Sequence, residues 1–130
     1  FATGRYEARP DDSLRLVDCM ITNAVRCAPP GNKPLPVEEA TCRPFLTARI
    51  AALPRLKVIV TLGDVSRPNV LKALALKGSA APPGHGVEAA LGGYVILNSY
   101  HCSRLNTNTG RLTPAMFEAV FRRARQIIEN

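Results

Sequence analysis

The chain has 130 residues and a mass of 14.0 kDa, which is the size of one domain. Its formal net charge of +7 and pI of about 9.8 favour a polyanionic partner, most commonly nucleic acid. No apolar run approaches the ~20 residues of a membrane span, and the polar N-terminus has no signal-peptide pattern. We therefore expect a single domain over residues 1–130, cytoplasmic, nucleoid-associated and monomeric, with no membrane contact.

The N-terminal part is predicted to contain one strand and one helix. Residues 1–14 are polar and predict a loop, whereas residues 14–25 are largely apolar and predict a buried strand. Four prolines and a glycine in residues 28–36 predict a stiff, irregular loop. Residues 37–53 then predict a helix with two glutamates in its first turn, kinked or divided at Pro44.

The remaining chain alternates between strands and helices. The β-branched run 56–62 predicts a buried strand, followed by a tight turn at Gly63 and a helix. Residues 78–93 are rich in Gly, Ala and Pro and predict a loop, and residues 94–97 predict a third strand. Thr113 is expected to cap a last helix, with a proline at its first position.

Three strands that alternate with three helices predict an α/β fold, a three-layer α/β/α unit with a small, mostly parallel sheet. Ligands of such sheets bind beyond the carboxyl ends of the strands. The polar segments expected there are residues 22–23, 63–64 and 101–108. The functional site is therefore predicted at this edge.

The segment after the third predicted strand is the most informative one. Residues 99–113 read SYHCSRLNTNTGRLT and combine the imidazole of His101 with hydroxyl, amide and guanidinium groups. Such groups are donors to phosphate, so the segment favours a site on DNA over a structural histidine. A second segment, 21–34, reads ITNAVRCAPPGNKP and contains Asn23 at the end of its predicted strand. This amide can read an imide edge such as that of uracil, or can hold its own turn.

Four cysteines occur, and none of them forms a CxxC pair, which weakens a zinc-ribbon interpretation. Cys19 lies inside a predicted strand and is interpreted as a small buried hydrophobic residue. His85, between two glycines, is expected either to line the cleft or to cap a turn.

The segments ITNAVRCAPPGNKP, EEATCRPFL and SYHCSRLNTNTGRLTPAMF resemble motifs of the iron–sulfur (family 5, type b) uracil-DNA glycosylases. The resemblance covers essentially the whole chain, and the last segment is its most specific part. It implies a three-layer α/β/α fold, removal of uracil and other deaminated bases from DNA, and a 4Fe–4S cluster.

The resemblance also implies roles for individual residues. His101 would stabilise the negative charge that develops at uracil O2, and Asn23 would recognise the flipped base in a pocket that also includes Cys102. Leu105 would fill the space that the base leaves, although many relatives have Tyr there. The implied DNA contacts are Ser103, Arg104, Leu105, Asn106 and Arg111.

Cys27 and Cys42 match two of the four thiolates that such a cluster requires. The family's other two cysteines, and a Gly-rich first motif with a water-activating acidic residue, lie upstream. Nothing in residues 1–130 resembles them, so the family's N-terminal part is expected to be missing from this sequence. Two alternatives follow: a catalytically silent DNA-binding module of the same fold, or a generic basic α/β domain that uses Cys27 and Cys42 for zinc.

Overall fold

The structure is a computed structural model that describes residues 1–24, 35–77, 81, 83–91 and 93–129. Its centre is a three-stranded sheet of β3 (Val58–Leu62), β4 (Glu88–Leu91) and β5 (Tyr94–Ser99), in the order β3-β5-β4. β5 lies parallel to β3, with Val58 opposite Val95 and Leu62 opposite Ser99. β4 is antiparallel to β5, so the sheet is mixed.

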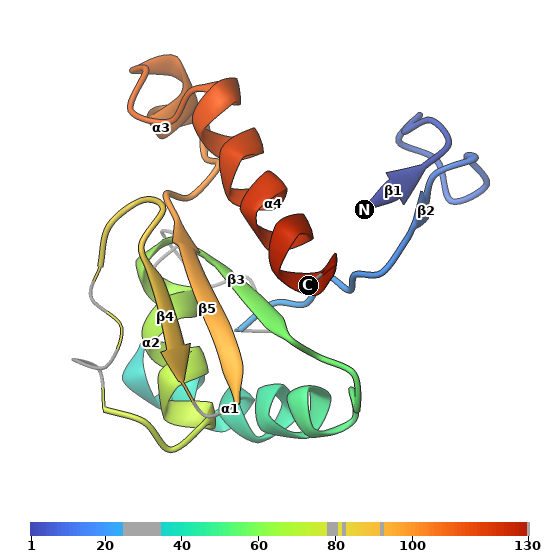
Figure 1. Ribbon diagram of the computed structural model, residues 1–130. Coiled ribbons are helices and arrows are strands. Elements are labelled where there is room, and N and C mark those ends of the chain that lie inside the picture. The colour runs from blue at the N-terminus through green and yellow to red at the C-terminus, as the bar shows by residue number, and fades with distance from the viewer. Residues whose placement is uncertain (25–34, 78–80, 82, 92, 130) are drawn as a thin grey trace.

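Helices cover both faces of this sheet (Figure 1). Side chains alternate along β5: Ile96 packs with α1 (Pro36–Ala51) and α2 (Gly63–Ala73), and Leu97 packs with α4 (Pro114–Glu129). This period of two is what a strand buried on both faces requires. The fold is thus the expected three-layer α/β/α arrangement.

α4 begins as its sequence predicts. The Thr113 hydroxyl accepts a hydrogen bond from the Met116 amide at 3.1 Å, and Pro114 occupies the first helical position. The apolar side of the helix buries Val120 and Ala124 against β5. The expected cap is confirmed.

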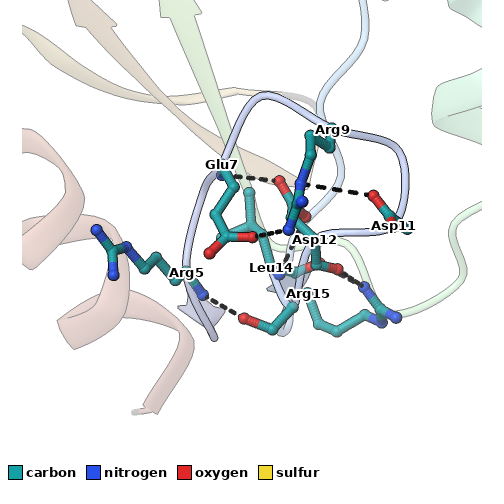
Figure 2. Close-up of polar contacts among 8 residues, drawn as sticks. Arg5, Glu7, Arg9, Asp11, Asp12, Leu14 and Arg15 are labelled. Atoms are coloured by element: carbon teal, nitrogen blue, oxygen red, sulfur yellow. Dashed lines mark hydrogen bonds and ion pairs between the residues drawn. The ribbon is translucent and has the colours of Figure 1, made fainter.

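A small hairpin of β1 (Ala2–Thr3) and β2 (Arg15–Leu16) lies beside α4, apart from the sheet (Figure 1). Its loop is organised by Asp12, which is 8% exposed (Figure 2). The Asp12 carboxylate accepts hydrogen bonds from the Glu7 amide at 3.0 Å and the Leu14 amide at 3.1 Å. One carboxylate therefore closes the loop between the two short strands.

The buried strand predicted over residues 14–25 is wrong. Only Arg15–Leu16 is a strand, and Val25 lies outside the described residues. Met20 and Ile21 are 49% and 77% exposed, and Cys19, predicted to be buried, is exposed. Apolar character alone suggested burial, but within the described part of the chain this segment pairs only with the two residues of β1.

Two further boundaries differ from the prediction. Residues 78–93, predicted as a loop, contain β4, whose EAAL sequence has low strand propensity and depends on its pairing with β5. α1 runs through Pro44 without division, close to the predicted span 37–53. The predicted loop 28–36 falls mostly outside the described residues.

Within the described ranges no helix is long and apolar enough to cross a membrane.

Candidate functional site

The candidate site lies at the edge of the sheet where β3 and β5 end together. Because these strands are parallel and Leu62 pairs with Ser99, the residues that follow them, Gly63 and Tyr100, emerge side by side. α3 (Arg104–Asn108) and the start of α4 lie beyond this edge (Figure 1). This is the place at which open α/β sheets bind ligands.

His101 is exposed at this edge and rests against Gly63. A Cβ atom at Gly63 would lie 3.0 Å from His101 Cβ and 3.4 Å from His101 Cδ2. Gly63 also has a φ of +88°, a conformation that side chains disfavour. The glycine therefore makes the sharp turn from β3 into α2 and leaves room for the imidazole.

The backbone of His101 is fastened by the helix that follows it. The Ser103 hydroxyl caps α3 by accepting a hydrogen bond from the Asn106 amide at 3.4 Å. The Asn106 side-chain amide donates to the His101 carbonyl at 2.9 Å. The amide of Leu112, which is buried, donates to the Asn106 carbonyl at 3.0 Å. The motif is thus anchored to the core at one end and to His101 at the other.

Tyr100 stands between two other side chains of the site. The Arg111 guanidinium lies over its ring, 4.6 Å from the centroid, which is cation–π geometry. The His85 ring packs against it with 5.1 Å between centroids. Arg111, one of the predicted DNA contacts, is thereby held on Tyr100, the residue that precedes His101.

Two further residues of the predicted site, Leu105 and Cys102, are exposed to solvent. Leu105, at the second position of α3, is 73% exposed, which is unusual for a leucine. Cys102 is exposed as well. Arg104 begins α3, but its side chain lies outside the described part of the structure.

Asn23 is exposed and lies against α1. It lines a pocket of about 260 Å³ together with Thr22 and α1 residues that include Phe45 and Arg49. Of the described residues that line this pocket, none belongs to the segment 99–113. Among the described residues, this pocket therefore includes Asn23 but not His101.

The structure describes only one of the two predicted metal ligands. Cys42 is a free, buried thiol in α1, and Cys27 lies outside the described residues. In the described portion of the chain, no three side chains of His, Cys, Asp or Glu come together to hold a metal ion. The described residues therefore supply one of the thiols that a cluster would need, that of Cys42.

The three arginines of α4, Arg122, Arg123 and Arg125, are each engaged in an ion pair. Arg122 pairs with Glu118 in the same helix at 2.6 Å, and Arg125 pairs with Asp18 at 3.3 Å. Arg123 donates two 2.8 Å hydrogen bonds to the Glu88 carboxylate in β4. These hydrogen bonds from Arg123 hold the pKa of Glu88 below its usual range.

Sequence reasoning missed two supports of His101. It gave no role to Tyr100, and it left His85 open between a cleft residue and a turn cap. The glycines on both sides of His85 were the available signal. Its partners, 15 and 31 residues away along the chain, became known only from the fold.

Comparison with known proteins agrees with this geometry. The family model described as the uracil DNA glycosylase superfamily matches residues 4–125. A type-5 uracil-DNA glycosylase of Thermus thermophilus is 43% identical over 126 residues, which cover 96% of this chain and 58% of that protein. Type-5 enzymes of Mycobacterium bovis and Pyrobaculum aerophilum are 42% and 40% identical, and the matches cover 44% and 51% of their lengths. The chain thus spans about half the length of the curated relatives it matches, and it belongs to the uracil-DNA glycosylase superfamily.

Proposed function

We propose that this chain forms part of a DNA-repair glycosylase that removes uracil from DNA. The enzyme would hydrolyse the bond between C1′ of the deoxyribose and N1 of uracil and leave an abasic site. The observation that carries this proposal is the anchored His101 at the joint carboxyl end of two parallel strands. Three relatives named as uracil-DNA glycosylases, about 40% identical, support it.

In this mechanism His101 acts on the leaving base. When the C1′–N1 bond breaks, its electron pair departs with uracil, and negative charge accumulates on O2. An N–H of the exposed imidazole would donate a hydrogen bond to that oxygen and stabilise the charge. Water adds its oxygen to C1′ and releases a proton, and protonation of the uracil anion balances that loss, so that uracil leaves as the neutral base. No residue of this chain is assigned to activate that water.

Asn23 and the segment around α3 would bind the DNA. The Asn23 side chain can donate and accept together, which matches the alternating edge of uracil. Cys102 is proposed for the base pocket from the resemblance alone, because the described residues that line the pocket beside Asn23 do not include it. Ser103, Arg104 and Arg111 would contact DNA phosphates, and Asn106 would also contact the DNA. Leu105 would enter the duplex, and its exposure supports this role because a wedge must be free to leave water.

The decisive experiment is uracil excision from an end-labelled duplex by the full protein and by its His101→Ala variant. Loss of one oxyanion donor is expected to lower the rate by about 10²–10³-fold. Lys72→Ala, on the exposed side of α2, is the matched control and should retain full activity. Absence of excision by the unaltered protein would refute the proposed function, and full activity of the alanine variant would refute the role of His101. Substrates with hypoxanthine test the other deaminated bases.

We further propose that Cys27 and Cys42 supply two of the four thiolates of a 4Fe–4S cluster. Support comes from the buried, unpaired thiol of Cys42 and from relatives that carry the type-5 name. Such a cluster would cross-link the segment containing Cys27 to α1, which is a structural contribution. Cys42→Ser in the full protein should lose most of its iron and acid-labile sulfide, whereas Cys19→Ser should keep both. Zinc in place of iron in the unaltered protein would contradict the cluster.

A further inference from the structure

His85 connects three segments of the chain through one imidazole ring. Its Nδ1 lies 3.0 Å from the Tyr100 amide nitrogen, and its Nε2 lies 3.0 Å from the Met116 carbonyl oxygen. A backbone N–H can only donate and a carbonyl can only accept, so Nδ1 is the acceptor and Nε2 carries the proton. The neutral ring is therefore held in one tautomer, with both nitrogens occupied.

The loop that carries His85 is fixed to the sheet on both sides of the histidine. The Asn98 side-chain amide donates to the Gly84 carbonyl at 2.9 Å, and the Gly86 amide donates to the Asn98 carbonyl at 2.8 Å. Asn98 is buried in β5, and its own amide oxygen accepts a 2.9 Å hydrogen bond from buried Thr61 of β3. The imidazole is thus mounted on the two parallel strands whose ends form the site.

The backbone amide that His85 binds belongs to Tyr100, the residue directly before His101. The Tyr100 amide belongs to the peptide that leads out of β5, and His101 follows it. On its other side, the His101 carbonyl accepts from Asn106. His101 consequently lies between two fixed points, one supplied by His85 and one supplied by α3.

We propose that His85 is a positioning residue that sets the place of His101 for glycosidic bond cleavage. This inference rests on the proposed function, because it assigns His85 a task in that reaction. The His85 ring also packs against the Tyr100 ring, over which the Arg111 guanidinium lies. His85 itself need not touch DNA, since both of its nitrogens are already engaged within the protein.

The test compares His85→Gln with His85→Leu in the full protein. Glutamine offers one acceptor and one donor and can replace both hydrogen bonds, whereas leucine has a similar size and neither group. His85→Leu is expected to lower kcat by about 10–100-fold, as a small misplacement of a catalytic group does, with KM changed less than about twofold. His85→Gln should recover most of kcat.

A double-mutant cycle with His101→Ala separates positioning from general damage. If His85 acts through His101, His85→Leu costs no further kcat once His101 is alanine. The loss of thermal stability caused by leucine should be the same in both backgrounds. An equal loss of kcat in the two backgrounds, or no recovery with glutamine, would overturn the proposal.

A readout that needs no activity distinguishes this inference from the proposed function. Amide hydrogen exchange at Tyr100, followed by NMR, should be protected in the unaltered protein and in His85→Gln, and fast in His85→Leu. The His101 ring signals should move only in the leucine variant. If the unaltered protein excises no uracil, the proposed function fails, and the exchange experiment still decides the position of His101. Unchanged protection and ring signals in His85→Leu would overturn the inference.

Discussion

The imidazole of His101 has little room beside it, because the turn that ends β3 passes directly against its Cβ. Gly63 combines two properties at this point: a positive φ and the absence of a side chain facing the histidine. An alanine there would suffer backbone strain and would also displace the ring. These two effects can be separated, because the chain has another glycine with only the first property. Gly93 has a φ of +87°, and a Cβ atom there would contact nothing within 4 Å.

We predict that Gly63→Ala and Gly93→Ala lose similar stability but differ in activity. Each should lower the free energy of unfolding by about 1–2 kcal/mol, the cost of a left-handed conformation with a side chain. Only Gly63→Ala should also reduce uracil excision, by about tenfold or more, since it moves His101. Chemical denaturation and single-turnover excision measure the two quantities. Equal activity of the two variants would show that His101 tolerates the displacement.

At the residue scale, the sequence singled out His101 as a candidate but gave little sign of the residues that support it. The histidine belongs to a contiguous motif after a strand, and contiguous patterns can be read directly. Gly63 was predicted as a turn, but its contact with the histidine depends on the parallel register of β3 and β5. His85 depends on hydrogen bonds between segments far apart in sequence. Such contacts are products of the fold, and no local pattern encodes them.

Among the elements, α3 is the smallest and the one that carries the predicted DNA contacts. Its sequence Arg-Leu-Asn-Thr-Asn has weak helix propensity and no apolar period, so residues 104–108 were predicted as loop. The cap from Ser103 and the anchor at Leu112 stabilise it instead. The helix holds Leu105 outward on a fixed base, as a wedge requires.

Leu105→Ala should impair excision from duplex DNA more than excision from single strands. The wedge would compensate for lost stacking in a duplex, and a single strand has no partner to leave. We expect the rate on duplex DNA divided by the rate on single strands to fall several-fold. Thermal stability should change little, since Leu105 is exposed. Val37→Ala, which removes a 66% exposed side chain from α1, is the matched control and should leave the ratio unchanged. Equal loss on both substrates would contradict a wedge.

β4 is connected to α4 by the bidentate pair of Glu88 and Arg123. The pKa of Glu88 is lowered in the folded protein by the hydrogen bonds from Arg123. A carboxyl whose pKa falls on folding contributes stability above its unfolded pKa, and this contribution disappears as pH falls through the lowered folded value. Because the pair is exposed to solvent, the contribution is small and is screened by salt.

Glu88→Gln should therefore melt slightly below the unaltered protein at neutral pH. The difference should shrink as pH falls below the ordinary range of a glutamate carboxyl, and should vanish once Glu88 is protonated in both states. Thermal melts over a pH series at low salt provide the measurement. Glu118→Gln breaks a pair within one helix and serves as the control, with a smaller effect expected. A difference that persists at acid pH would mean that the side chain acts through packing.

For the whole molecule, the count of 17 lysines and arginines overstates the number of positive groups free to meet DNA, because some of them are paired with the ten carboxylates that reduce the net charge to +7. Arginines of α4 face carboxylates on β4, on α4 itself and at Asp18. Composition favours a polyanionic partner, and the proposed function would supply DNA in that role, but composition cannot show which cations are already paired. The three-layer fold was predictable because long periodic segments determine the layers. The mixed order of the sheet was not, because β4 has a weak strand pattern.

The same distribution of charge predicts which arginine the DNA affinity depends on. Arg111 is exposed, sits on Tyr100 and lies at the site, whereas Arg122 is paired with Glu118. Both variants, Arg111→Gln and Arg122→Gln, remove one positive charge, so a general electrostatic effect would be equal for the two. Release of a counterion from one phosphate changes the slope of log K against log salt by about 0.9. We expect Arg111→Gln to reduce the slope of duplex binding by about that amount and Arg122→Gln to leave it nearly unchanged. Equal slopes for the two variants would mean that DNA senses only the overall charge, and that the site at the ends of β3 and β5 does not dock the phosphate backbone.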